Sequence, residues 1–87
     1  MKYTYGIHAR ARILERGISL KAVDHVLSEN TEKMVVPSKS DPEIELVLGV
    51  FEGRGYAVIV NRHSYKIVTV RRAQPSEEKR LKGEGLL

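Results

Sequence analysis

HARARILERGIS, residues 8–19, decides the fold because it closes one predicted helix and opens the next. Residues 7–16 contain neither Gly nor Pro and are rich in Ala, Leu and Arg, which are good helix formers. Gly17 follows at the place where a left-handed residue commonly ends a helix, and Ser19 is a natural N-cap. The stretch therefore predicts two helices, residues 7–16 and 20 to about 29, joined by a tight turn.

The second predicted helix is amphipathic. At about 100° per residue, one side carries the apolar residues and the other the polar ones. The apolar residues are Leu20, Val23, Val26 and Leu27, and the polar ones are Lys21, Asp24, His25 and Ser28. This helix should lie on the surface with its apolar side against a sheet.

From Glu32 onward the sequence is typical of a sheet. Four runs are rich in Val and Ile: EKMVV, EIELVLGVFEG, GYAVIVN and YKIVTVRR. The connectors, residues 37–42, 52–55 and 61–64, are hairpin-sized, whereas a parallel crossover needs about a dozen residues. We therefore expect an α+β fold, with two N-terminal helices packed on a four-stranded, mostly antiparallel sheet.

The longest strand predicts which sheet face the helices cover. Ile44, Leu46, Leu48 and Val50 share one face, and we expect the helices there. The other face carries Val47 and Phe51 but also Glu43, Glu45 and Gly49, and should be half-polar.

Residues 1–73 should form a single domain, since a chain of 87 residues is too short for a second core. Residues 74–87 are charged, with Leu81 as the only apolar residue before Gly83. We expect them to be a tail that is frayed or ordered only against a partner.

The composition narrows the function classes. The chain has a net charge of +4 and no Cys, which modestly favours polyanionic partners and leaves no thiolate nucleophile or Cys-based zinc site. It has no run of about 18 apolar residues. We expect no membrane span, no targeting signal at Met1 and a cytoplasmic location.

A polar ridge follows the first predicted helix. His8, Arg12, Glu15 and Arg16 lie within about 100° of arc, because residues four apart nearly superimpose on a helix. Arg offers a bidentate fork for phosphate oxygens, and His titrates near neutral pH, so this ridge could grip and cleave a phosphodiester. The alternative is an ordinary charged helix face, with Glu15 pairing locally. Periodicity does not decide between the two.

The same residues carry a resemblance. His8, Arg12 and the run Arg16-Gly17-Ile18-Ser19, with the strand YKIVTVRR at residues 65–72, resemble an uncharacterised prokaryotic domain family. That family is grouped with the RelE-like and BrnT-like toxins of the colicin-type ribonuclease superfamily, and the resemblance covers residues 7–72. It implies a RelE-like fold and an antitoxin protein as partner. Arg10 departs from the pattern, which more often has an apolar residue there, and leaves the direction of His8 open.

The resemblance implies four site residues: His8, Arg12, Arg16 and Thr69, the last as a strand hydroxyl. Together with the chemistry of the ridge, it predicts a metal-independent endoribonuclease of toxin type. His8 would move protons, and the two arginines would hold the phosphate of the RNA. The alternative is a non-catalytic domain of this fold that binds RNA or a protein partner.

Other residues could support RNA binding. Arg54, Arg62, Arg71 and Arg72 lie at predicted strand ends or turns, where a phosphate backbone could be held. Thr69 and Arg71 should share a sheet face with Tyr65 and Ile67. Tyr56 and Tyr65 could stack bases, although half-buried strand tyrosines are commoner.

Two further interpretations are disfavoured. His25 and His63 fall in separate segments from His8 without metal-ligand spacing, so we expect no metal site and no cofactor. The tight helical turn also suggests a DNA-binding helix-turn-helix. The second helix, however, exposes no Arg, and a sheet rather than a third helix follows it.

Overall fold

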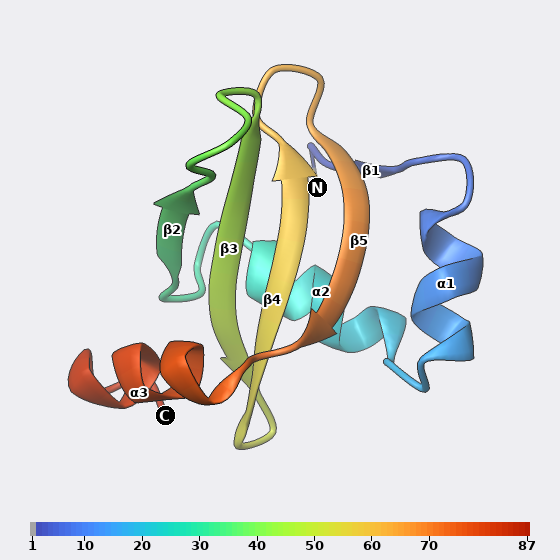
Figure 1. Cartoon of the computed structure of the whole chain (residues 1–87). Helices are drawn as coiled ribbons and strands as arrows, with labels where there is room; N and C mark the ends of the chain where they lie inside the picture. Colours follow the sequence, from blue (N-terminus) through green and yellow to red (C-terminus); the bar gives the residue numbers. More distant parts are fainter. Residues whose placement is uncertain (1) are drawn as a thin grey trace.

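The two helices predicted around residues 8–19 are present (Figure 1). The structure, a computed structural model that describes residues 2–87, forms helix α1 at Ala9–Glu15 and helix α2 at Leu20–Leu27. Both are slightly shorter than predicted, by two residues or fewer at either end, which is the usual uncertainty of a helix boundary.

The turn between the helices is a Schellman motif. Gly17 adopts a left-handed φ of 70°. Its N–H donates to the carbonyl of Leu14 at 3.0 Å, and the N–H of Ile18 donates to the carbonyl of Ile13 at 3.1 Å. Ile13 and Ile18 are both buried. The motif therefore satisfies the last carbonyls of α1 and fixes the direction in which the chain enters α2.

Helix α2 begins at the predicted cap. The hydroxyl of Ser19 accepts the backbone N–H of Lys21 at 3.1 Å. The predicted apolar side packs on the sheet together with α1, in a core of Ile13, Ile18, Ala22, Val23, Val26, Leu27, Val47, Tyr56, Val58, Val60, Ile67 and Val70.

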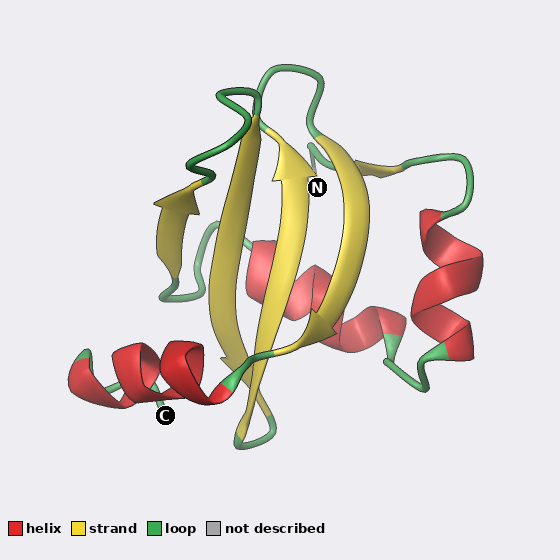
Figure 2. Cartoon of the chain, in the orientation of Figure 1, coloured by secondary structure: helices red, strands yellow, loops and turns green. Residues whose placement is uncertain are grey.

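The sheet has five strands in the order β1-β5-β4-β3-β2 (Figure 2). The four predicted strands are confirmed and pair antiparallel. The fifth strand, β1, pairs parallel with β5 at the edge and was missed, because two residues carry no readable period. The bounds are β1 Thr4–Tyr5, β2 Met34–Pro37, β3 Ile44–Phe51, β4 Arg54–Asn61 and β5 Lys66–Arg72.

Strand β5 contains a β-bulge. Val68 has no partner in β4, although Ile67 and Thr69 on either side of it are paired. Ile67 and Val70 are three residues apart, yet both lie in the core under the helices. The expectation that Ile67 shares a face with Thr69 and Arg71 is therefore wrong, because the extra residue reverses the alternation of side chains.

The helices α1 and α2 cover the opposite sheet face from the one predicted. Val47 packs under α2, whereas Leu48 lies on the other side of the sheet. Gly49 gives the physical reason: a Cβ at this position would lie 2.7 Å from Cγ1 of Val26. Helix α2 packs on the face where Gly49 has no side chain, so Val26 can approach the sheet closely.

The predicted C-terminal tail contains a helix instead. Helix α3, Pro75–Gly83, starts with a capping box formed by Gln74 and Glu77. Leu81 is fully buried against Leu48 and Ala57. Leu86 and Leu87 pack against the same cluster, so apolar residues of the charged segment anchor it to the second sheet face. The chain thus forms three layers, with the sheet between α1 and α2 on one side and α3 on the other (Figure 1).

Within residues 2–87, no helix is both long and apolar enough to cross a membrane.

The left-handed turn should be sensitive to Gly17→Ala. A Cβ at Gly17 would meet no atom within 4 Å, so the cost comes from the φ of 70° alone. We expect the free energy of unfolding, measured by urea denaturation, to fall by about 1–2 kcal/mol. Gly83→Ala is the matched control, because Gly83 also has open space around it but lies inside α3 without a left-handed φ. The control should stabilise the protein by about 0.4–1 kcal/mol. Equal effects at the two positions would contradict the assignment of strain to Gly17.

Candidate nucleic-acid interface

A groove of about 360 Å³ lies between the start of α1 and the start of β5, beside the loop that joins β4 to β5. We call it the α1–β5 groove. It is lined by Gly6, Ile7, His8, Ala9, Arg12, Asn61, Ser64, Lys66, Ile67 and Val68. Two members of the predicted ridge, His8 and Arg12, therefore face the same depression.

His8 occupies the N-cap position of α1, but its side chain makes no capping hydrogen bond. Only its backbone carbonyl takes part in the helix, accepting the N–H of Arg12 at 3.1 Å. The side chain is exposed. The imidazole is thus not used to hold the helix and remains available to a ligand of the groove.

The seating of α1 leaves Arg10 outside the ridge. Ala9 and Ile13 are the buried residues of the helix. The guanidinium of Arg10 lies 5.8 Å from the centre of the Tyr5 ring, on the flank of α1 away from Arg12 and Arg16. The polar residue at this position is therefore compatible with a helix that directs His8 toward the groove.

Lys66 adds a third basic side chain to the α1–β5 groove, and sequence reasoning missed it. A lysine near the start of a predicted strand is too common to be a signal. Among residues 2–87, no Asp or Glu lines the groove. A larger cavity of about 580 Å³ beside α2 is different, because Asp24 and Glu29 line it along with Lys2. The smaller groove is thus the one suited to an anion.

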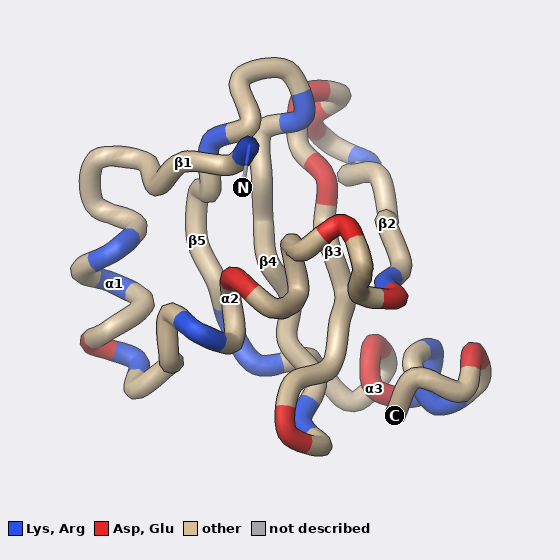
Figure 3. Tube along the Cα trace, turned by 180° about the vertical axis from the view of Figure 1, so that it is seen from behind, with Lys and Arg blue, Asp and Glu red and all other residues tan. Residues whose placement is uncertain are grey.

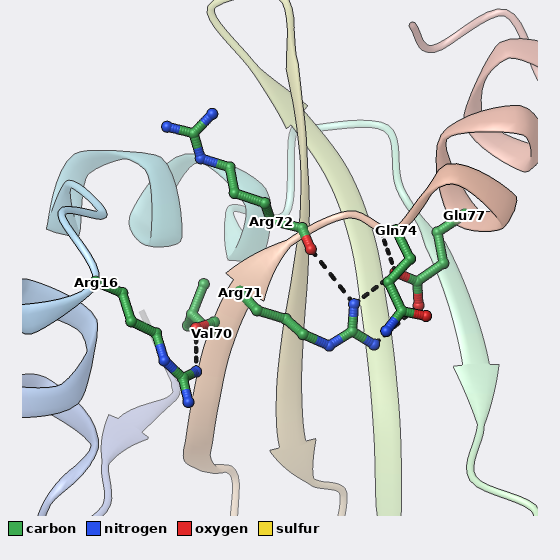
Figure 4. Close-up of polar contacts among 6 residues, drawn as sticks. All are labelled: Arg16, Val70, Arg71, Arg72, Gln74 and Glu77. Carbon is green, nitrogen blue, oxygen red and sulfur yellow. Dashed lines mark hydrogen bonds and ion pairs between the residues drawn. The ribbon is translucent and has the colours of Figure 1, made fainter.

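The structure brings Arg16 and Thr69 together, but not inside the groove. Nη1 of Arg16 donates to Oγ1 of Thr69 at 2.8 Å and to the carbonyl of Val70 at 2.9 Å, the second contact being drawn in Figure 4. Neither Arg16 nor Thr69 lines the α1–β5 groove. His8 and Arg16 cap the two ends of α1 and are eight positions apart, which corresponds to a rise of about 12 Å. The ridge therefore presents two positions along β5 rather than one.

Arg71 is engaged by α3. Its Nη1 and Nη2 donate to Oε1 and Oε2 of Glu77 at 2.6 and 3.0 Å (Figure 4). Oε1 also accepts the backbone N–H of Gln74 at 2.8 Å. Hydrogen bonding to Arg71 lowers the pKa of the Glu77 carboxyl below its ordinary value, in opposition to burial, and raises the pKa of Arg71. This candidate RNA contact therefore has a structural partner that fastens α3 to the sheet.

The other arginines do not form one patch. Arg72 lies over the buried ring of Tyr56, with its guanidinium carbon 5.6 Å from the ring centre. Arg54 opens β4 at one end of the sheet, and Arg62 follows β4 at the other end. Only Arg62 is close in sequence to the lining residues Asn61 and Ser64.

Basic residues lie along α1 and at both ends of β5 (Figure 3). Of the two candidate stacking residues, Tyr56 is buried, and Tyr65 makes an edge-to-face pair with Tyr3 at 5.5 Å between ring centroids.

His25 packs on Phe51, with 5.1 Å between ring centroids. Across residues 2–87, no group of three or more His, Cys, Asp or Glu side chains is placed to hold a metal ion.

The chain matches no protein-family model, no curated protein and no solved structure in the comparisons. The resemblance to RelE-like and BrnT-like toxins therefore stays a prediction, and the site is interpreted from its geometry.

The Arg71–Glu77 pair predicts a pH-dependent stability. The folded-state pKa of Glu77 is lowered, so the pair contributes fully at neutral pH and its contribution is lost as the pH falls through that pKa. Glu77→Gln should lower the free energy of unfolding at pH 7 by about 1.5–3 kcal/mol, the value of hydrogen bonds to charged groups. The difference from wild type should shrink below about pH 4. Glu78→Gln is the control, since the Glu78 side chain has no ion pair within residues 2–87. A pH-independent deficit in Glu77→Gln would show that the charge of Glu77 is not what matters.

Proposed function

We propose that the protein binds single-stranded RNA along the edge formed by α1 and β5 and cleaves it at the α1–β5 groove. The observation that carries the proposal is the composition of that groove: His8, Arg12 and Lys66 line it without any acidic side chain from residues 2–87. Three basic groups at one depression favour a phosphate, and the histidine among them supplies an imidazole that can accept and donate a proton.

The chemistry follows from these residues. His8 takes the proton of a ribose 2′-hydroxyl, whose oxygen attacks the adjacent phosphorus. The bond from phosphorus to the 5′-oxygen breaks, and the proton held by His8 passes to that oxygen. The products are a 2′,3′-cyclic phosphate and a 5′-hydroxyl. Arg12 and Lys66 stabilise the extra negative charge on the phosphate oxygens in the transition state.

Arg16 and Thr69 serve a neighbouring part of the strand. Nη1 of Arg16 is held by Thr69 and by the Val70 carbonyl, so the guanidinium has a fixed position with other N–H groups left to donate. One helix turn beyond Arg12, it would contact a second phosphate. Thr69 is then a positioning residue. The proposed enzyme is an endoribonuclease of the RelE-like toxin type that contacts the RNA backbone at two or more phosphates.

A second candidate function is RNA binding without cleavage. It is favoured by the presence of a single histidine in the groove, because efficient cleavage of this kind uses a proton acceptor and a separate proton donor. Both functions include RNA binding. Only the first produces RNA fragments with 2′,3′-cyclic phosphate ends, so analysis of the products distinguishes the two.

His8→Gln tests catalysis. Wild type should cut single-stranded RNA in the presence of a chelator and leave 2′,3′-cyclic ends, as read by mass spectrometry of the fragments. The variant should lose about 10²-fold or more in rate while its affinity for RNA is retained, since a positioned acid or base typically supplies that much. His25→Gln is the matched control, because His25 lies on α2 against Phe51. Failure of wild type to cut RNA, alone or with ribosomes, together with retained binding, would favour the second function.

Arg12→Ala tests binding. With about −0.7 per phosphate contact, three contacts give a slope of roughly −2 for log affinity against log salt. Arg12→Ala should make the slope shallower by about 0.7 in a fluorescence anisotropy titration with a short single-stranded RNA. Arg54→Ala at the far end of β4 should leave it unchanged. Arg16→Ala should weaken RNA binding and cleavage, but it also removes two internal hydrogen bonds, so its stability must be measured beside its affinity. A slope near zero in wild type would exclude phosphate contacts as the basis of RNA binding.

A further inference from the structure

The α1–β5 groove is not only basic. Two exposed aliphatic side chains line it: Ile7, which is 92% exposed, and Val68, which is 43% exposed. They come from segments far apart in the sequence. Ile7 directly precedes His8, and Val68 is the unpaired bulge residue of β5. Isolated exposed aliphatic residues are ordinary, but these two line the same depression as the basic groups.

We infer that the groove holds one unpaired nucleotide of the RNA, with the base against Ile7 and Val68 and the phosphate toward His8, Arg12 and Lys66. The inference rests on the proposed function and specifies the form of its substrate. An apolar surface next to cations, with no acidic neighbour, matches a nucleotide, since a base is apolar on its face and its phosphate is anionic.

The size of the groove supports a single nucleotide. At about 360 Å³ it lies at the lower end of the range of small-molecule sites, roughly 300–1,000 Å³. A base within a duplex is stacked and paired and could not enter it. An unstacked base of a single strand could, and single-stranded segments are where proteins read RNA bases.

The polar side of the groove supplies hydrogen-bond donors. Oδ1 of Asn61 accepts the backbone N–H groups of His63 and Ser64 at 2.9 and 3.0 Å. The amide oxygen is therefore occupied, and Asn61 can offer a ligand its Nδ2 donors. Ring nitrogens and carbonyl oxygens of a base are suitable acceptors for them. Asn61 and Ser64 are held by the same turn, so this edge of the groove is ordered before a ligand arrives.

The test compares two oligonucleotides. The probes are a fluorescein-labelled five-nucleotide 2′-O-methyl oligouridine, which cannot be cut through its 2′-oxygen, and the same oligomer with an abasic residue at the centre. Wild type should bind the complete oligomer about fivefold more tightly, because the base buries apolar surface against Ile7 and Val68. Ile7→Thr and Val68→Thr should reduce that preference while leaving the salt slope unchanged.

Val35→Thr is the matched control, because Val35 is 53% exposed on β2, away from the groove. It should keep the full preference. A measurement without variants accompanies it: the methyl resonances of Ile7 and Val68 should shift on addition of the complete oligomer and shift less with the abasic one. That readout is unaffected if a variant folds poorly.

The outcomes separate this inference from the proposed function. Equal affinity for the two oligomers with a normal salt slope would overturn the nucleotide inference and leave RNA backbone binding intact. Loss of the preference in Val35→Thr as strongly as in Val68→Thr would also overturn it. Failure of wild type to bind either oligomer would overturn both.

Discussion

The extra residue in β5 is the constraint on which the candidate site depends. Carbonyls that face one edge of a regular strand alternate, and those of Tyr65 and Ile67 face β1, where they accept the N–H groups of Thr4 and Gly6. With the bulge at Val68, the next carbonyl at this edge is that of Val70 instead of Thr69. Arg16 donates a hydrogen bond to this carbonyl. The edge carbonyls of β5 are therefore bonded by β1 and Gly6 at one end and by Arg16 at the other. Helix α1 is fixed between them.

This arrangement divides the work along α1. Ala9 and Ile13 seat the helix, Gly17 ends it, and Arg16 fastens its last turn to β5. The side chains of His8 and Arg12 do not attach the helix to the sheet, and they are the two members of the ridge that line the groove. The question of whether the ridge is a charged face or a site therefore has a mixed answer in physical terms. At one end Arg16 fastens the helix to β5 through Nη1 and keeps its other N–H groups, and at the other end His8 and Arg12 are available to a ligand.

Local signals predicted the helices and strands, and non-local ones were missed. Gly17 and Ser19 act within a few residues of themselves, so their roles could be read from the sequence. The sheet face chosen by α2 depends on the fit of Val26 over Gly49, two residues from different segments. Helix α3 depends on one buried leucine and on the pairing of Glu77 with Arg71. The same pairing engages Arg71, a predicted RNA contact. It could not be read from the sequence because Glu77 lies in the segment that was expected to be a tail.

For the candidate site as well, local patterns could be read from the sequence, whereas residues brought together by the fold could not. The period of the helix was sufficient to place His8, Arg12 and Arg16 on one ridge. The resemblance added Thr69 as a site residue but did not predict its hydrogen bond to Arg16. Lys66 and Ile7 were not found, because a basic residue at a strand start and an exposed aliphatic residue before a helix have no meaning until the fold brings them together. A site made at a junction between a loop, a helix start and a bulge is not periodic. Its apolar and basic parts become a single surface only through the register of β5, so a shift of one residue at Val68 would move that strand's contributions away from the groove.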